Sequence, residues 1–141
     1  AGGGRFLLIV SIKQMYPGHS RQAAIVAAQC HGGAYANRWV IVVDDDVDIT
    51  DTNEVLWAAL TRCDPAEDIE ILRKNWSTHL DPLGYPKDGG RFFNNRMILD
   101  ACRSYERKDT FPPVATSSPK ARKHVMDKWP ELFTAKTGYR Q

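Results

Sequence analysis

The stretch RWVIVVDDDVDITDTNEVLWAALTRCDP, residues 38–65, decides how this chain folds. It opens with an apolar run, which is typical of a strand buried on both faces of a sheet. Four aspartates within five positions end that run. Asp51 or Thr52 can then cap a helix over residues 53–63, whose apolar side chains recur at helical spacing. A buried strand followed at once by a capped helix predicts an α/β unit.

The neighbouring segments extend this unit in both directions. Residues 5–13 form a second apolar run, and residues 20–35 predict an Ala-rich helix that Ser20 caps and a glycine pair at 32–33 ends. Residues 68–73 alternate between apolar and polar side chains as a strand does. Strand, helix, strand, helix and strand in this order predict a mostly parallel sheet flanked by helices, with a βαβαβ core.

The second half of the chain is less regular. Residues 75–95 are rich in Gly, Pro, Asp and Asn and predict a long loop, and residues 96–102 return to strand character. The Pro112 and Pro113 pair excludes helix, whereas residues 118–133 begin with a cap and a proline and predict a C-terminal helix. We expect a linker at 1–4, one α/β domain over 5–133 and a flexible tail at 134–141.

Composition narrows the class of protein. The chain has 141 residues, 26% of them charged and 43% hydrophobic, which suits one globular domain. Its net charge of +2 comes from dispersed basic residues, so we expect no nucleic-acid partner. No apolar stretch approaches the roughly 20 residues of a membrane span. The three cysteines are widely spaced and form no CxxC pair, which predicts reduced thiols in a cytoplasmic protein.

The aspartate cluster has three interpretations. Residues 46–50 match the DxDxT pattern of aspartate-nucleophile phosphatases, but such enzymes need a further acidic pair and residues 96–102 supply one acid. A metal site also uses clustered carboxylates, yet neighbouring side chains at a strand end point in alternating directions. The third interpretation, which we favour for most of these acids, is that they cap the next helix and pair with arginines.

Ligands of open parallel sheets bind beyond the carboxyl ends of the strands. Lys13 and His19 follow the first predicted strand and His79 follows the third, so we expect all three at one edge, where they could bind an anion or a carboxylate. The alternative is that His19 caps its turn and Lys13 pairs with the aspartates. The histidines lack metal-ligand spacing, so we expect no metal site. The sequence contains neither a GxGxxG motif nor a phosphate-binding P-loop.

Four stretches carry a more specific pattern. They are VSIKQMYPGHSRQAA at residues 10–24, VIVVDDDVDITDTNEVLWAALTRCDPAEDI at 40–69, WSTHLDP at 76–82 and DACRSYERKDTFPP at 100–113. Together they resemble the C-terminal domain of the UbiD family of decarboxylases, and the resemblance covers residues 5–133. The last stretch resembles the branch acting on aromatic acids rather than the ubiquinone-precursor branch.

The resemblance implies a function for a longer protein. Members of the family remove carbon dioxide reversibly from aromatic, heteroaromatic or α,β-unsaturated acids, using prenylated FMN held with a divalent metal (Mn or Mg) and potassium. Their Glu-Arg-Glu catalytic set, metal ligands and most flavin contacts lie in preceding domains. We therefore expect no catalytic residue, no bound cofactor and no activity in this chain alone. The family's C-terminal domain closes one wall of the active site and builds a homo-oligomer.

The resemblance also marks individual residues. Carried over by position, Thr78 and Leu80 face the substrate ring and His79 lies beside them. His31 and Gly32 fall near the pocket or cofactor edge, although some relatives have a lysine at the Gly32 position.

Two other functions compete with this one. In the first, the chain is an assembly module whose C-terminal helix and TFPPV segment, residues 110–114, dock on a neighbour. The second is the phosphatase, in which Asp46 would be the nucleophile.

Overall fold

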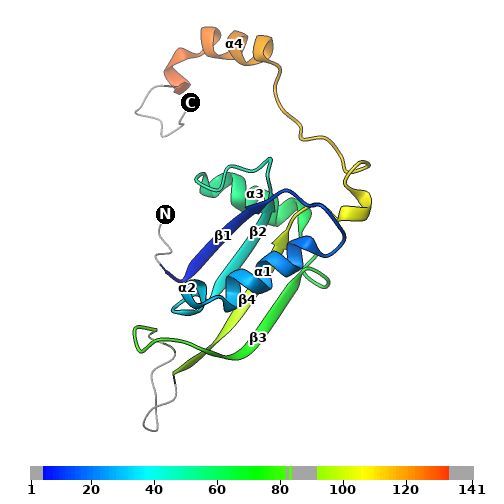
Figure 1. Ribbon diagram of the computed structural model, residues 1–141. Helices are drawn as coiled ribbons and strands as arrows, with labels where there is room; N and C mark the ends of the chain where they lie inside the picture. Colours follow the sequence, from blue (N-terminus) through cyan, green and yellow to red (C-terminus); the bar gives the residue numbers. More distant parts are fainter. Residues whose placement is uncertain (1–4, 82, 84–91, 134–141) are drawn as a thin grey trace. The chain divides into compact units, whose positions relative to one another are not determined.

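A four-stranded sheet with helices on both faces forms the first part of the chain in the computed structural model, which describes residues 5–81, 83 and 92–133 (Figure 1). The strands are β1 (Leu7–Ile12), β2 (Trp39–Asp44), β3 (Ile69–Trp76) and β4 (Phe93–Ala101). Their order is β1-β2-β4-β3, in which the β1–β2 and β2–β4 pairs are parallel and the β3–β4 pair is antiparallel. The predicted α/β fold with a mostly parallel sheet is confirmed.

The direction of the third predicted strand is wrong. Residues 68–73 belong to β3, an antiparallel edge strand, and the third parallel strand is β4. The chain leaves β2 through a helix, runs along the far edge as β3 and returns as β4 between β2 and β3. Ile71 is 50% exposed, in keeping with an edge strand. The pairing shifts register between Leu72 and Asn75, and Lys74 there has a left-handed φ of 57°.

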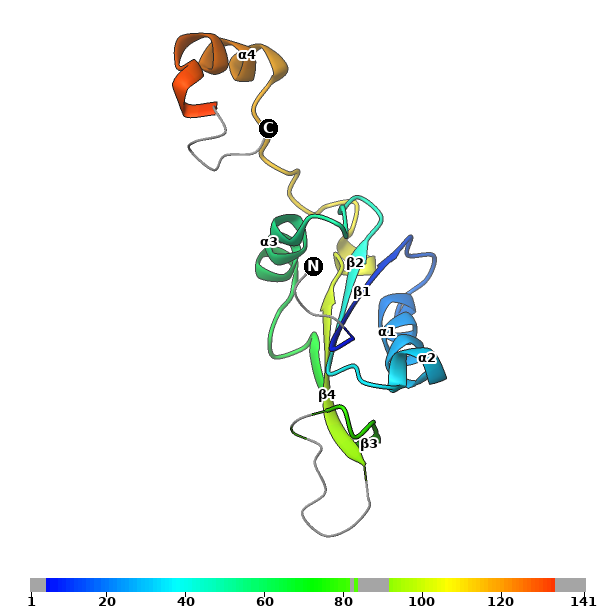
Figure 2. The ribbon, with the colours of Figure 1, turned by 90° about the vertical axis from the view of Figure 1, so that its left-hand side faces the viewer.

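Helices cover the two faces separately (Figure 2). Helix α1 (His19–Gln29) and the short α2 (His31–Ala34) lie on one face, and α3 (Thr52–Arg62) lies on the other. The expected cap of α1 is wrong, because Gly18, with φ 79°, precedes the helix and Ser20 is buried in its first turn. A glycine reaches this left-handed conformation without the steric cost of a side chain.

The glycine pair does not end the first helix. The break comes at Cys30, and both glycines lie within α2. The Cys30 Sγ accepts a hydrogen bond from the Gly33 amide at 3.4 Å, which starts the new helix. A Cβ at Gly33 would overlap the Ala27 carbonyl, so only glycine fits this close approach of the two helices.

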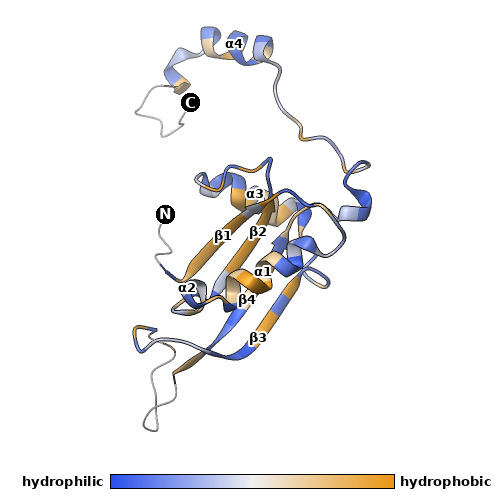
Figure 3. Ribbon diagram, viewed as in Figure 1, coloured by the Kyte–Doolittle hydropathy of each residue, from blue (hydrophilic) through white to orange (hydrophobic). Residues whose placement is uncertain are grey.

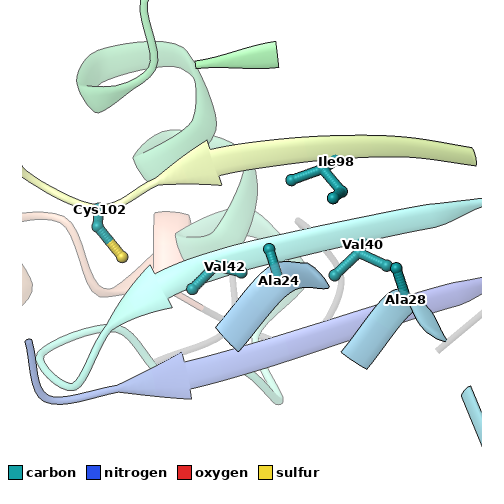
Figure 4. Packing of buried hydrophobic residues seen from close by; sticks show 6 residues of the cluster. All are labelled: Ala24, Ala28, Val40, Val42, Ile98 and Cys102. Atoms are coloured by element: carbon teal, nitrogen blue, oxygen red, sulfur yellow. The ribbon is translucent and has the colours of Figure 1, made fainter. Parts of the chain in front are cut away.

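The core has one layer on each face of the sheet because successive side chains of β2 point to opposite faces. On the α1 face, Ala24 and Ala28 pack against Val40, Val42 and Ile98 (Figure 4). On the α3 face, the cluster consists of Val43, Val47, Val55, Ala58 and Ala101. Figure 3 shows that β1 and β2 are hydrophobic over most of their length, as expected of strands covered on both faces.

The predicted long loop is shorter than residues 75–95, because β3 continues to Trp76 and β4 begins at Phe93. Residues 75–76 and 93–94 pair with each other as antiparallel strands. A sequence rich in Gly and Asn gives no sign of this pairing. The predicted linker at 1–4 and tail at 134–141 lie outside the described residues and remain predictions. The centre of the loop, at 82 and 84–91, also lies outside them.

The chain divides into two compact units between Phe111 and Pro112. The second unit contains α4 (Pro119–Lys128) and the 3-10 helix η2 (Pro130–Phe133), whereas the 3-10 helix η1 (Tyr105–Arg107) belongs to the first. The Ser118 Oγ accepts a hydrogen bond from the Ala121 amide at 3.1 Å, which confirms the predicted cap. No side chain of α4 or η2 is buried. Within the described part of the chain, no helix combines the length and apolarity needed to cross a bilayer.

Candidate functional site

Buried polar residues lie at both ends of the strands, whose arrangement Figure 1 shows. The carboxyl ends of β1, β2 and β4 share one end, here named the carboxyl edge, because these strands are parallel. Strand β3 runs the other way, so the residues that follow it lie at the opposite end. Lys13 and His19 therefore do not share an edge with His79, and the expected three-residue cluster is wrong.

The carboxyl edge is closed by the Asp44 carboxylate, which is 4% exposed. The Gln14 amide donates to Asp44 Oδ1 at 2.8 Å, and Arg62 Nη1 donates to Oδ2 at 3.1 Å. The Arg103 backbone amide and Nε donate to the same oxygen at 2.8 and 3.1 Å. These donors follow β1, lie in α3 and follow β4, so one buried carboxylate ties three elements together.

Asp46 and Asp51 are also engaged in structure. Both oxygens of Asp46 accept from the Arg62 guanidinium at 2.8 Å, and this hydrogen bonding lowers the pKa of Asp46. Asp51 caps α3 by accepting from the Asn53 amide at 2.8 Å. The interpretation as helix caps and arginine partners is confirmed for these residues. A nucleophile or a metal ligand needs a free carboxylate oxygen, and the guanidinium groups already neutralise Asp44 and Asp46.

Lys13 and His19, the two candidates at this edge for binding an anion, differ in their contacts. The His19 Nδ1 accepts from the Met15 amide at 3.3 Å and its ring stacks on Tyr16 at 4.4 Å, so His19 does cap its turn. Lys13 is exposed and forms no ion pair with any described residue. Among the residues that the structure describes, no three His, Cys, Asp or Glu side chains come together as a metal site.

At the opposite end, residues 77–81 form a turn whose last residue, Asp81, is completely buried. The Arg38 guanidinium pairs with both carboxylate oxygens, and the Asn94 Nδ2 donates to Oδ2 at 3.0 Å. The Asp81 amide donates to the Thr78 carbonyl at 3.0 Å and closes the turn. We name residues 77–81 the Asp81 turn.

The three residues expected at the substrate differ in how the Asp81 turn presents them. Leu80 is 60% exposed, and His79 is exposed with its ring edge-on to Phe92 at 5.8 Å. Thr78 is only 5% exposed, and its hydroxyl accepts from the Leu80 amide at 3.3 Å. In this chain, therefore, His79 and Leu80 point outward, whereas Thr78 shapes the turn from within.

His31 lies at the same end of the sheet as the Asp81 turn. Its ring stacks on that of Trp76, the last residue of β3, with centroids 5.9 Å apart. Gly32 is the next residue of α2, so both pocket-edge candidates of that helix lie beside the end of β3. The structure thus brings His31, Gly32 and residues 78–80 to one end, and places Lys13 and His19 at the other.

Sequence reasoning missed the buried polar residues that hold this end together. Arg96 is 1% exposed and donates to the backbone carbonyls of Ala28, Ala34 and Trp76, which joins α1, α2 and β3. Burial lowers the pKa of Arg96. Its only sequence signal is an arginine directly before the apolar run of β4.

Known proteins match this chain in sequence and in structure. Residues 1–101 match the family model of the 3-octaprenyl-4-hydroxybenzoate carboxy-lyase C-terminal domain, UbiD_C. An uncharacterized protein of Archaeoglobus fulgidus is 34% identical over 127 residues, 89% of this chain and 26% of that protein.

Solved structures of UbiD-class enzymes share the fold. HmfF of Pelotomaculum thermopropionicum in complex with FMN has a TM-score of 0.67 and 27% identity, over 84% of this chain and 25% of HmfF. The 3,4-dihydroxybenzoic acid decarboxylase of Klebsiella pneumoniae has a TM-score of 0.67 and 30% identity, over 94% of this chain and 27% of that enzyme. The vanillic acid decarboxylase of Sedimentibacter hydroxybenzoicus, in closed form, also has a TM-score of 0.67. Its identity is 26%, over 93% of this chain and 27% of that enzyme chain.

The chain spans about a quarter of the length of each of these relatives. The family model covers most of the chain and ends at the last residue of β4. The fold likeness extends beyond that point, since two of the solved structures align with more than nine tenths of the chain. This chain therefore belongs to the UbiD family and corresponds to the C-terminal domain of its carboxy-lyases.

Proposed function

We propose that this chain closes the active site of a decarboxylase of aromatic or heteroaromatic acids, with the Asp81 turn as the wall that meets the substrate. The observation that carries the proposal is the presentation of His79 and Leu80, exposed side chains on a turn that a buried carboxylate fixes. Relatives that decarboxylate 3,4-dihydroxybenzoic acid and vanillic acid support the substrate class.

The chemistry of these side chains suits selection rather than bond breaking. Leu80 offers an aliphatic surface against which a flat ring can pack, and His79 offers a hydrogen-bonding edge. Thr78 shapes the same wall through its hydrogen bond to the Leu80 amide. None of these groups is an electron sink for a carbanion, so the reaction itself belongs to other parts of the parent enzyme.

The residues described here do not fit the cofactors that the family implies. Prenylated FMN carries a phosphate, and the sequence contains neither of the phosphate-cradling motifs considered above, GxGxxG and the P-loop. A divalent metal needs free carboxylate oxygens, and those of Asp44 and Asp46 are already paired with arginines. We propose that the flavin-binding part of the parent protein holds prenylated FMN, the metal and potassium, as the FMN and prenylated-FMN complexes of HmfF suggest.

The direct test compares the full-length enzyme that carries this domain with this chain alone. Both are incubated with prenylated FMN, Mn²⁺, potassium and a panel of aromatic acids, and carbon dioxide release is measured. We expect release only from the full-length enzyme. Release by the chain alone, or by neither protein, would contradict the proposal.

A second proposed function is assembly, and an apolar groove on the α3 face supports it. The groove has a volume of about 440 Å³. Its lining includes Phe6, Leu7, Trp39, Ile41, Leu56 and Leu60, from β1, β2 and α3 and the residue before β1. Leu60 is 81% exposed, and an apolar surface of this kind on a folded domain marks an interaction site.

The proposed occupant is the second unit of another copy of the chain. That unit buries none of its helical side chains, and an isolated helix of ten residues is marginal in water. Helix α4 is basic, with Lys120, Arg122 and Lys123 in its first half. The residues around the start of α3 are acidic, including Asp48, Asp51 and Glu54, so the two surfaces are complementary in charge.

Sedimentation velocity tests this function on the chain itself. We expect a dimer or larger species, which Leu60→Lys dissociates and Leu80→Lys, at an exposed leucine that is not part of the groove lining, leaves intact. A strict monomer at high concentration would contradict assembly through this groove. So would a Leu60→Lys variant that sediments like the wild type.

A further inference from the structure

The Asp81 carboxylate is the most completely satisfied acidic group at the candidate site. Its Oδ1 accepts from Arg38 Nη2 and from the Leu83 amide, the latter at 2.9 Å. Its Oδ2 accepts from Arg38 Nε at 3.2 Å and from Asn94 Nδ2 at 3.0 Å, with the Ser77 hydroxyl at 3.5 Å. These donors come from the residue before β2, the start of β4, the turn itself and Leu83 just after it.

The donors are themselves fixed in place. Arg38 lies next to the first residue of β2 and its guanidinium packs over the Phe6 ring at 5.2 Å. The Asn94 Oδ1 accepts from Arg96 Nε at 3.2 Å, which leaves the Asn94 amide nitrogen to donate. Burying an ionised carboxylate is costly unless it is paired and hydrogen-bonded, so displacement of Asp81 would break several charge-assisted bonds at once.

The position of the exposed residues follows from this anchor. Leu80 directly precedes Asp81, and the amides of both residues bond to Thr78, at its hydroxyl and its carbonyl. A turn closed in this way has little freedom to move His79 or Leu80 without moving Asp81. A wall for selecting flat acids needs this kind of support, because a small displacement of a positioning group can cost a large factor in rate.

We propose that Asp81 is the positioning residue of the substrate wall and sets the selectivity of the enzyme through the backbone of residues 78–80. This inference rests on the proposed function of the wall. Asp81 is buried beneath the turn, so its effect on the substrate is transmitted by Leu80 and His79. The same carboxylate also fixes the turn in this chain on its own, where its role can be measured separately.

The first test measures amide hydrogen exchange by NMR in this chain. The Asp81→Asn variant keeps the shape of the side chain but removes the charge and replaces one acceptor oxygen with a donor. We expect the amides of residues 80, 81 and 83 to exchange at least about tenfold faster, with the carboxyl-edge amides of Val47 and Arg103 unchanged. Unchanged exchange at residues 80, 81 and 83 would overturn the proposal.

Two further variants keep this test decisive. Asp44→Asn makes the same change in a buried, arginine-paired carboxylate at the carboxyl edge, and it should accelerate Arg103 exchange but not that of the Asp81 turn. Arg38→Gln removes the charge from the opposite partner and should reproduce the effect of Asp81→Asn. If Asp81→Asn fails to fold, Arg38→Gln gives the same readout, and an unaffected turn in that variant would equally overturn the proposal.

The second test uses the full-length holoenzyme and the ratio of kcat/KM for a narrow and a wide aromatic acid. We expect Asp81→Asn to change this ratio by about tenfold, and Asp44→Asn to leave it unchanged even where it lowers thermal stability. If Leu80→Ala changes the ratio and Asp81→Asn does not, the positioning role of Asp81 is contradicted, whereas the proposal that the Asp81 turn meets the substrate is supported. If neither changes it, the proposed wall itself fails.

Discussion

Two buried aspartates, at opposite ends of the same sheet, perform different tasks with similar chemistry. Asp44 is 4% exposed and Asp81 is completely buried, and each accepts hydrogen bonds from arginine. Asp44 joins residues that follow β1 and β4 to α3, so its network closes the carboxyl edge. Asp81 instead anchors a turn whose neighbouring side chains, His79 and Leu80, remain exposed.

We propose that this difference decides where the domain meets a partner or a substrate. Ligands of parallel sheets usually bind at the carboxyl ends of the strands, but here ion pairs fill that edge. The antiparallel strand β3 creates a second polar end, where the buried network lies below the surface and exposed residues lie above it. The proposed function therefore depends on the one strand that breaks the parallel pattern.

The largest expected effect comes from breaking the carboxyl edge. Asp44→Ala removes the acceptor of the Gln14 amide, Arg62 and Arg103, and leaves a buried guanidinium with one carboxylate partner fewer. We expect the free energy of unfolding, measured with urea, to fall by about 3 kcal/mol or more. The adjacent Asp45→Ala, at an exposed position, should change it by less than about 0.5 kcal/mol. Equal effects of the two substitutions would show that the Asp44 network does not hold the edge together.

The reactivity of two cysteines tests how tightly the carboxyl edge is closed, and here we expect a smaller effect. Cys102, just after β4, is 5% exposed, and burial raises its pKa, whereas Cys30 beside α2 is exposed. We expect an aromatic disulfide reagent to modify Cys30 about a hundredfold faster than Cys102 in the native protein. Mass spectrometry of the labelled peptides distinguishes the sites. Comparable rates without denaturant would mean that the carboxyl edge opens readily.

The smallest expected effect is the pH dependence of the Asp46 ion pair. The hydrogen bond from Arg62 lowers the pKa of Asp46, so this pair stabilises the fold above about pH 4 and loses that contribution as the pH falls further. The side chain is 38% exposed, so solvent screening limits the contribution to under about 1 kcal/mol.

Urea titrations of wild type and Asp46→Asn from pH 7 to pH 2 check this expectation. The wild type should be the more stable of the two at neutral pH, and the difference should vanish near the acid end. A difference that grows on acidification would contradict the assigned direction of the pKa shift.

Local signals in the sequence were sufficient for much of the fold. The apolar runs predicted β1 and β2, and Ser118 predicted the start of α4. Asp51 or Thr52 was the predicted cap of α3, and Asp51 is the cap. The direction of β3 was not predictable in this way, because it depends on pairing with β4, a strand that follows much later. The alternation of residues 68–73 did indicate a half-exposed strand, and an edge position was its better interpretation.

The candidate site could be predicted only in part. The resemblance marked residues 78–80, and the structure places His79 and Leu80 on the surface but buries Thr78. The pairing of Arg38 with Asp81 spans 43 positions, and no periodicity or spacing reveals such a contact. Buried polar networks depend on tertiary structure, so the anchor of the turn became visible only in three dimensions.

The central claim is that the Asp81 turn forms a wall of the active site, and Leu80→Ala in the full-length holoenzyme tests it most directly. The measurement is the ratio of kcat/KM for a narrow and a wide aromatic acid, with Leu56→Ala, at a 48% exposed leucine of the groove, as the matched control. We predict a change of about tenfold or more for Leu80→Ala and none for Leu56→Ala. An unchanged ratio in Leu80→Ala, or an equal change in both variants, would contradict the account.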